Sequence, residues 1–439
     1  MSMGLLEVLA AVVMVILMFI GTPVPVALGI GGIAGLFGLA GGLDAAFTIA
    51  AKVVFDTLND FVLLAVPLFI LMGEILSKGG VGEKMFKLFD AFLRRIPGGV
   101  GIATVLTCAV LASMCGTSVA IAAMVGGFAI PNLQKYGYTF PLALGICVAG
   151  GALGILIPPS VPMIVYSSFT QESAGKLFMA GVIPGILAVI IFCIYVAVTF
   201  WRNPERLVAP KATRHEKWVA FKEGIWALLI PVGIMIPLYV GIATPTEIAA
   251  IGVVWSLFVA MVIYHTIKPK DILPLLRSAL SGIVMITFII CGAMLFGNAV
   301  TQLGLGQQIS GFFLSHGFPA WVFMVLTMIL MLIMGCFLEG ASIMLITLPV
   351  ILPSLMAYKL DLIWFAVIMV INIEVGLLTP PVGLNLYAID GVAKKLGFPS
   401  TLSIVIKGSW PFMVLYLVVM VIVGFVPQLA LWIPSHMFK

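Results

Sequence analysis

The sequence predicts an all-α polytopic membrane protein, an inverted-topology repeat with two re-entrant hairpins and two broken helices. Three observations support this fold class. The chain is 62% hydrophobic and 9% charged, whereas an ordinary soluble domain is roughly 25% charged. Its apolar residues form contiguous runs, which suits membrane-spanning helices and not the alternating strands of a barrel. Finally, several prolines recur at one fixed spacing in the two halves, and matching loops of the two halves differ in basic charge.

Five prolines recur 222 residues further along the chain. The pairs are Pro23 and Pro245, Pro97 and Pro319, Pro131 and Pro353, Pro158 and Pro380, and Pro159 and Pro381. With 26 prolines in 439 residues, five coincidences at one spacing indicate an internal duplication. Gly154 and Gly376 match at the same spacing. Backbone breaks that recur in both halves of a membrane protein point to its transport site.

Composition and motifs exclude several classes of protein. The net charge of +5 comes from basic residues in loops, which suits orientation signals and not nucleic-acid binding. The six cysteines lie in apolar segments without a C-x-x-C pair, so they predict neither a disulfide framework nor a metal site. No phosphate loop, nucleophile elbow or zinc motif occurs. We therefore expect no enzyme, no resident cofactor and no nucleic-acid partner, but membrane lipid around the chain.

Residues 1–200 form the first predicted repeat. Its spans lie near 4–20, 24–41, 61–77 and 178–200, with a basic segment at 78–97. The apolar segment 98–132 is too long for one crossing and too short for two with a loop. Two half-helices of about 22 Å each fit it better, so it predicts a re-entrant hairpin with a small polar tip. A further span, 140–170, is interrupted by glycine and the first proline pair.

The second predicted repeat, 224–439, follows a connector at 201–223. Its spans are expected near 225–242, 248–265, 279–298 and 408–427, its hairpin at 320–353 and its broken helix at 361–390. Each half thus holds five spans and one hairpin.

Loop charge predicts the orientation of the two halves. Segment 78–97 carries five Lys and Arg residues, and its repeat partner 300–319 carries none. The positive-inside rule places the first segment and the basic connector in the cytoplasm and the second segment outside. An odd number of crossings per repeat inverts the second half. Both termini are then periplasmic, and the two hairpins enter from opposite faces.

The breaks predict chemistry as well as shape. Each proline pair removes two N–H donors and frees carbonyl groups, and these suit a hard cation together with half-helix C-termini. Half-helix N-termini favour a carboxylate. One site can therefore hold an anionic substrate and coupling sodium ions. The alternative is that the breaks are packing kinks.

Two acidic residues lie beside these features. Glu339 is at the second hairpin tip, where the first half has Thr117, and Glu374 precedes the second break, where the first half has Ala152. Intramembrane acids are functional candidates, but each can instead cap a half-helix or satisfy amides. Both interpretations stay open. The candidate substrate-binding residues are Thr117, Ser118, Ser160, Glu339 and Asn385.

Several stretches resemble one family. They are 67–74, 115–120, 154–162, 244–247 and 372–385. Together they are similar, over nearly the whole chain, to the large membrane (M) subunit of tripartite ATP-independent periplasmic (TRAP) transporters. Family members typically carry Ser-Gly-Ser-Ser at the first tip. This chain has Cys115-Gly116-Thr117-Ser118, so position 115 offers a backbone carbonyl but no hydroxyl.

The resemblance implies an elevator-type ion-transporter fold in a bacterial inner (cytoplasmic) membrane. It implies sodium symport of an organic acid, such as a C4-dicarboxylate or sialic acid, with a small four-helix membrane subunit as a separate chain and a periplasmic substrate-binding protein. Carried over by motif, the first sodium site would use Ser113, Gly116, Gly154, Ile157 and Pro159. The second would use Gly335, Gly376, Thr379 and Val382.

Three alternatives remain at this stage. A stand-alone dicarboxylate or ion exchanger of related elevator fold would need no binding protein. An intramembrane enzyme would need clustered catalytic side chains, such as a His pair or a Ser–Lys dyad, and none is visible. A channel would need a continuous pore, whereas two opposed hairpin tips are expected.

Overall fold

The chain is built from helices, as its composition predicts. The computed structural model describes residues 12–18, 20–40, 42–202 and 210–437, and every regular element within these residues is a helix. Residues 12–18 are helical, and the start of the first predicted span lies outside the described residues. Six of the described helices are long and apolar enough to cross a membrane, or seven if one bent pair counts as a span. The prediction of an all-α membrane protein is confirmed.

Among the described residues from 24 to 201, the first half contains nine helices. They are α2 (Val24–Ala40), α3 (Leu43–Leu58), α4 (Ala65–Lys78), α5 (Val81–Leu93), α6 (Gly99–Cys115), α7 (Ser118–Lys135), α8 (Phe140–Gly151), α9 (Val161–Thr170) and α10 (Ala174–Trp201). Both segments expected to be interrupted contain two helices each. Residues 98–132 hold α6 and α7, and residues 140–170 hold α8 and α9.

The second half is also built from helices. It contains α11 (Arg214–Val240), α12 (Pro245–Phe258) with a π-turn (Val259–Ile263), a 3₁₀ turn (Pro269–Asp271), α13 (Ile272–Leu303), α14 (Leu305–Ser315), α15 (Ala320–Gly335), α16 (Gly340–Ala357), α17 (Leu362–Leu377), α18 (Leu384–Lys395), α19 (Leu402–Phe425) and α20 (Gln428–His436). Its hairpin and its broken helix again each hold two short helices.

Three helices lie in segments that the hydrophobic pattern left between spans. They are α3, α5 and α14. The apolar run of α3 is interrupted by three exposed charged residues, Asp44, Lys52 and Asp56. The hydrophobic pattern therefore does not predict this helix as a membrane span. Ala46 and Ala50 supply its buried face, which packs against Leu295 and Ala299 of α13. These helices are held by packing on neighbours and are too polar on one side to be recognised as spans.

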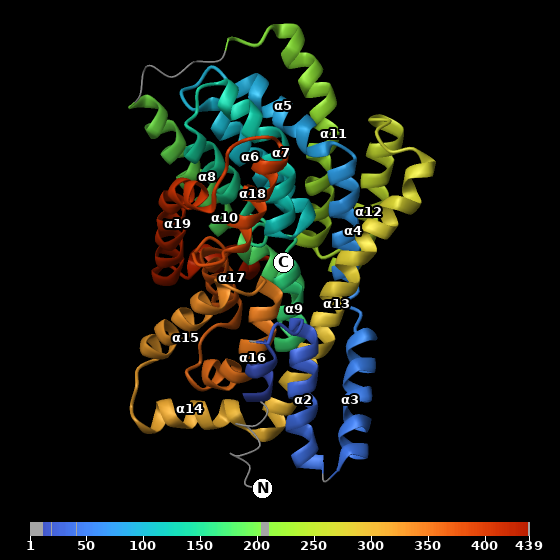
Figure 1. The fold of residues 1–439 in the computed structure, drawn as a ribbon, viewed down its shortest axis with the longest axis vertical. Coiled ribbons are helices and arrows are strands. Elements are labelled where there is room, and N and C mark those ends of the chain that lie inside the picture. The colour runs from blue at the N-terminus through green and yellow to red at the C-terminus, as the bar shows by residue number, and fades with distance from the viewer. Residues whose placement is uncertain (1–11, 19, 41, 203–209, 438–439) are drawn as a thin grey trace.

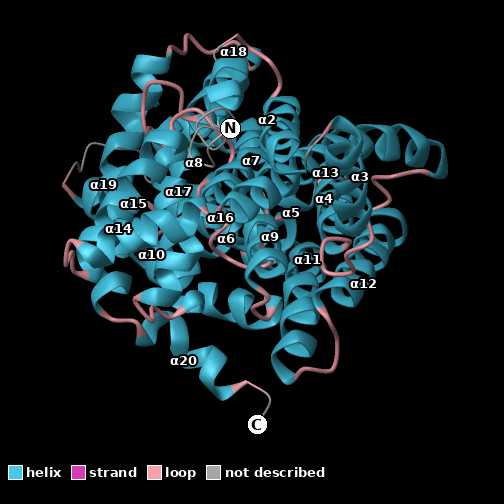
Figure 2. Ribbon diagram, turned by 90° about the horizontal axis from the view of Figure 1, so that it is seen from below, coloured by secondary structure: helices cyan, strands magenta, loops and turns pink. Residues whose placement is uncertain are grey.

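The two hairpins occupy opposite ends of the molecule (Figure 1). Helices α6 and α7 lie in its upper half with α5 above them, and α15 and α16 lie in its lower half with α14 below them. Viewed from below, α6, α9, α16 and α17 lie toward the middle, and α3, α12 and α20 lie nearer the rim (Figure 2). Four of the eight short interrupted helices, α6, α9, α16 and α17, therefore lie toward the interior of the protein (Figure 2).

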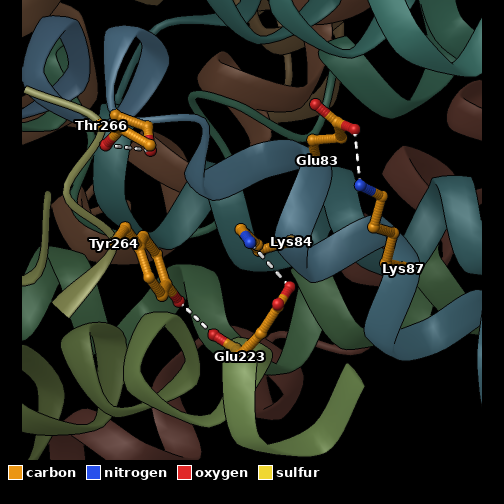
Figure 3. A network of polar contacts seen from close by, with 7 residues as sticks. Glu83, Lys84, Lys87, Glu223, Tyr264 and Thr266 are labelled. Carbon is orange, nitrogen blue, oxygen red and sulfur yellow. Dashed lines mark hydrogen bonds and ion pairs between the residues drawn. The ribbon is translucent and has the colours of Figure 1, made fainter. Parts of the chain in front are cut away.

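A polar network fixes α5 against the second half (Figure 3). Helices α4 and α5 meet at an angle of 63°. Lys84 Nζ lies 2.7 Å from a carboxylate oxygen of Glu223 in α11, and the Tyr264 hydroxyl donates to the Glu223 backbone carbonyl. Thr266 Oγ1 donates to the Gly79 carbonyl at the bend, at 2.9 Å. The bend is thus held by contacts from a distant part of the sequence.

Replacing Lys84 with methionine should lower stability slightly. Its ion pair with Glu223 joins side chains that are 26% and 40% exposed, and such a pair contributes about 1 kcal/mol or less. Lys87→Met is the matched control, because Lys87 pairs with Glu83 within the same helix and both side chains are more than half exposed. Thermal unfolding should shift measurably for the first variant and not for the second. Equal shifts would contradict a specific role for the contact between α5 and α11.

Candidate functional site

The first hairpin tip lies against the first break. Helix α6 ends at Cys115, and Gly116 follows in the left-handed conformation with φ of 68°. The Gly116 carbonyl accepts a long hydrogen bond from the Val161 amide, at 3.4 Å. A Cβ atom on Gly116 would lie 3.0 Å from the Pro159 carbonyl oxygen, and one on Gly154 would lie 2.8 Å from Ser118 Cα. Because these glycines have no side chain, the backbone of the hairpin tip can come into direct contact with the backbone of the break.

Two other residues predicted for the first sodium site have different surroundings. The Ser113 hydroxyl donates to the Val110 carbonyl within α6, at 2.6 Å. The Ile157 side chain points toward α10, because a Cβ atom on Gly185 would lie 2.6 Å from its Cγ1 atom. Ile157 can therefore offer only its backbone oxygen to a ligand.

The second hairpin tip meets the second break in a similar way. A Cβ atom on Gly335 would lie 2.8 Å from Gly376 Cα, and one on Gly376 would lie 2.7 Å from Gly335 Cα. The Gly383 amide donates to the Cys336 carbonyl at 3.0 Å. The Thr379 hydroxyl donates to the Val375 carbonyl at 2.6 Å and lies 3.3 Å from the Met413 sulfur. Val382 is half-buried on the same break.

The two halves also touch each other at this place. A Cβ atom on Gly340, the first residue of α16, would lie 3.4 Å from Ile155 of the first break. Glu374 of α17 accepts a hydrogen bond from the Ser118 hydroxyl and a second from the Ile155 amide, the latter at 3.4 Å. Both hairpin tips and both broken helices therefore converge on one region.

Buried polar atoms without partners mark the interior of this region. Ser160 and Asn385 are each 0% exposed. Among the described residues, neither the Ser160 hydroxyl nor either polar atom of the Asn385 amide has a hydrogen-bond partner, and the same holds for one carboxylate oxygen of Glu374. Such groups normally find partners when buried. They are therefore candidates for contact with a bound ligand.

The other candidate substrate residues differ from these two. Glu339 precedes α16 and caps it, because its carboxylate accepts from the Ala341 amide at 3.3 Å and the Ser342 hydroxyl at 3.4 Å. This favours the structural interpretation of Glu339. Thr117 occupies the equivalent position before α7 without a side-chain cap. Ser118 contacts Glu374, as described above.

The region offers oxygen ligands to a cation. Among the described residues, no three His, Cys, Asp or Glu side chains gather into a metal site. Carbonyl oxygens around the two proline pairs, the hydroxyls of the first tip and the Thr379 hydroxyl are the available donors, and these suit a hard cation. The donor set therefore fits the sodium ions expected from the breaks.

Sequence reasoning missed Tyr416 of α19. Its hydroxyl, which is fully buried, donates to the Ala152 carbonyl at the end of α8, at 2.7 Å. A lone tyrosine in an apolar helix was the available signal, because a buried hydroxyl normally has a partner. Its position along the sequence does not reveal which carbonyl it meets.

Two solved structures share this arrangement of helices. The fold is similar to that of the Alcanivorax borkumensis YdaH transporter, with a TM-score of 0.61, 14% identity and 90% of each chain covered. It is also similar to Neisseria gonorrhoeae MtrF, with a TM-score of 0.62, 14% identity and coverage of 90% of this chain and 85% of that one.

The chain belongs to the family of the tripartite ATP-independent periplasmic transporter DctM component, whose model matches residues 11–429. It is 36% identical over 394 residues to the Pseudomonas aeruginosa C4-dicarboxylate TRAP transporter large permease protein DctM, covering 89% of this chain and 90% of that protein. It is 30% identical to the Vibrio cholerae sialic acid TRAP transporter large permease protein SiaM, with coverage of 88% and 89%. It is 32% identical to the Escherichia coli 2,3-diketo-L-gulonate TRAP transporter large permease protein YiaN, with coverage of 87% and 88%. The chain is thus a transporter subunit and not an enzyme.

Proposed function

We propose that this chain carries out sodium-coupled secondary active uptake of an organic acid delivered by a periplasmic binding protein. The family supports transport of organic acids, because relatives are named for C4-dicarboxylate, sialic acid and 2,3-diketo-L-gulonate. Each of these compounds carries a carboxylate. The substrate class proposed here is therefore a carboxylate of this kind.

The main support for the location of the substrate site is the burial of Ser160 and Asn385. Ser160 immediately precedes α9, and Asn385 is the second residue of α18, so both lie at N-termini of half-helices. Both side chains have buried polar atoms that find no hydrogen-bond partner within the described ranges. A carboxylate would accept hydrogen bonds from them and would lie at the positive ends of two helix dipoles.

The two sodium sites are proposed at the contacts between each tip and its break. Gly116 and Pro159 meet in the first half, and Gly335 and Gly376 meet in the second. Helices α8 and α17 end beside these contacts. Their C-terminal carbonyl groups carry partial negative charge, which favours a cation.

An inverted repeat with an elevator-type movement fits the placement of the helices. Helices α5 and α14 lie at opposite ends of the molecule, and so do the two hairpins (Figure 1). Because α5 carries lysines and α14 carries no Lys or Arg, the positive-inside rule orients the α5 end toward the cytoplasm. We propose a bacterial inner membrane location with both termini periplasmic.

The proposed partners are a small four-helix membrane subunit, as a separate chain, and a periplasmic binding protein. Uptake into proteoliposomes should require all three components. The test omits each component in turn and measures uptake of a labelled C4-dicarboxylate, such as succinate, or of labelled sialic acid. Full uptake by this chain alone would favour a stand-alone exchanger of related fold.

Thr379→Ala should weaken sodium activation of uptake while leaving the protein folded. The hydroxyl lies on the second break and donates to the Val375 carbonyl, so its loss removes an oxygen from the proposed site. Thr48→Ala is the matched control, because Thr48 makes the same kind of hydrogen bond, to the Asp44 carbonyl, on the exposed helix α3. The half-saturating sodium concentration should rise for Thr379→Ala alone. An unchanged sodium activation curve would remove Thr379 from the site.

A further inference from the structure

We propose that Glu374 is a positioning residue that couples the first hairpin tip and the first break to the second broken helix. Ligand binding in one half then changes binding in the other. This inference rests on the proposed function and deepens it. It assigns a role to a side chain outside the predicted sodium and substrate sites.

The contacts of Glu374 join elements that are far apart in sequence. Its side chain is 0% exposed. The same carboxylate oxygen, Oε1, accepts from the Ser118 hydroxyl, 256 residues away, and from the Ile155 amide, 219 residues away. Ser118 opens α7 at the first tip, and Ile155 lies in the first break. One oxygen atom thus holds two parts of the first half.

The same helix reaches the second tip within one turn. Gly376, two residues after Glu374, packs on Gly335 at the end of α15. A shift of α17 that accompanies ligand binding at the second tip would therefore also move Oε1 of Glu374. The first tip must follow, or lose its hydrogen bonds.

The halves differ at this repeat position. Ala152 stands 222 residues before Glu374 and has no side-chain oxygen. Its carbonyl accepts from the Tyr416 hydroxyl, also across the two halves. The Tyr416 contact reaches the end of α8, whereas the Glu374 contact reaches the hairpin tip itself. Glu374 therefore provides a polar contact through which the second half can act on the first tip.

The contact works as a hydrogen-bond acceptor and not as an ion pair. Within the described ranges, Glu374 takes part in no salt bridge. Its second oxygen, Oε2, has no hydrogen-bond partner in the part of the chain that the structure describes. Helices α9, α15 and α16, which pack nearby, contain no Asp, Glu, Lys, Arg or His. A glutamine carbonyl oxygen can accept both hydrogen bonds in place of Oε1, so glutamine should preserve the function and leucine should not.

The test compares sodium activation of uptake in E374Q, E374L and S118A, each in proteoliposomes with both partner proteins. Wild type should respond steeply to sodium, and E374Q should match it. For E374L, the half-saturating sodium concentration should rise by about five-fold or more, the lower end of ordinary allosteric coupling, and the curve should become less steep. S118A removes the other partner and should act in the same direction. The double variant should show no shift beyond that of E374L, because E374L already removes the hydrogen bond that S118A removes.

Several outcomes would overturn the inference. Wild-type steepness in both E374L and S118A would show that the contact does not couple the halves. Equal losses in E374Q and E374L would show that charge matters and not hydrogen-bond acceptance. A wild type that ignores sodium would defeat the proposed function, and the inference with it. That result can be distinguished from a failure of the inference about Glu374 alone, because it is measured on the wild-type protein before any variant is made.

Discussion

Gly376→Ala should abolish transport. A Cβ atom at this position would lie 2.7 Å from Gly335 Cα and 3.1 Å from its carbonyl carbon. Both atoms belong to the backbone, so no side-chain rotation can relieve the clash. Overpacking of this kind costs about 1–3 kcal/mol or more, and the second tip would have to separate from the second break. Since the proposed sodium site lies at that contact, the rate of uptake should fall to background.

Gly424→Ala is the control for this variant. Gly424 lies in α19, and a Cβ atom there would meet nothing within 4 Å. Alanine also favours the helix, so uptake and thermal stability should match or slightly exceed those of wild type. Near-normal uptake by Gly376→Ala would show that the two helices do not need this close approach.

Asn385→Leu should stabilise the protein and abolish uptake. Leucine is similar in size, and it removes a buried amide whose oxygen and nitrogen both lack partners among the residues that the structure describes. The penalty of an unsatisfied buried polar group is about 1–3 kcal/mol, so thermal unfolding without substrate should shift upward. Substrate would lose an amide donor at the start of α18, so binding and uptake should be lost together.

Asn372→Leu is the matched control, with the opposite expected sign. Asn372 is also buried, but its side-chain amide donates to the Met328 carbonyl at 2.9 Å. Its loss removes a buried hydrogen bond and should destabilise the protein by about 1 kcal/mol. Destabilisation by both variants would indicate that Asn385 is satisfied in the free protein and would weaken its assignment to the substrate site.

The sequence was sufficient to locate the interrupted segments. The proline pairs and the small polar tips occur where helices end, because proline lacks an amide hydrogen and glycine tolerates the left-handed conformation. Thus α7 begins at Ser118 and α16 at Gly340, 222 residues apart. The hydrophobic pattern did not predict helices α3, α5 and α14, because they contain charged residues or are too short to form an apolar span.

The contacts between segments could not be predicted in the same way. The meeting of Gly335 with Gly376, and of Ser118 with Glu374, depends on how short helices pack after folding. Periodicity within one helix carries no information about its partner. For the same reason, Glu339 and Glu374 were equivalent as intramembrane acids in the sequence, although one caps its own helix and the other joins the two halves.

The most direct test of the central claim is uptake of labelled substrate into proteoliposomes with an imposed sodium gradient. The vesicles would contain this chain and its small membrane subunit, with the binding protein outside. An inward sodium gradient should drive accumulation above the equilibrium level, and collapse of that gradient with a sodium ionophore should end it. Accumulation of the same size when potassium replaces sodium would contradict sodium-coupled transport by this protein.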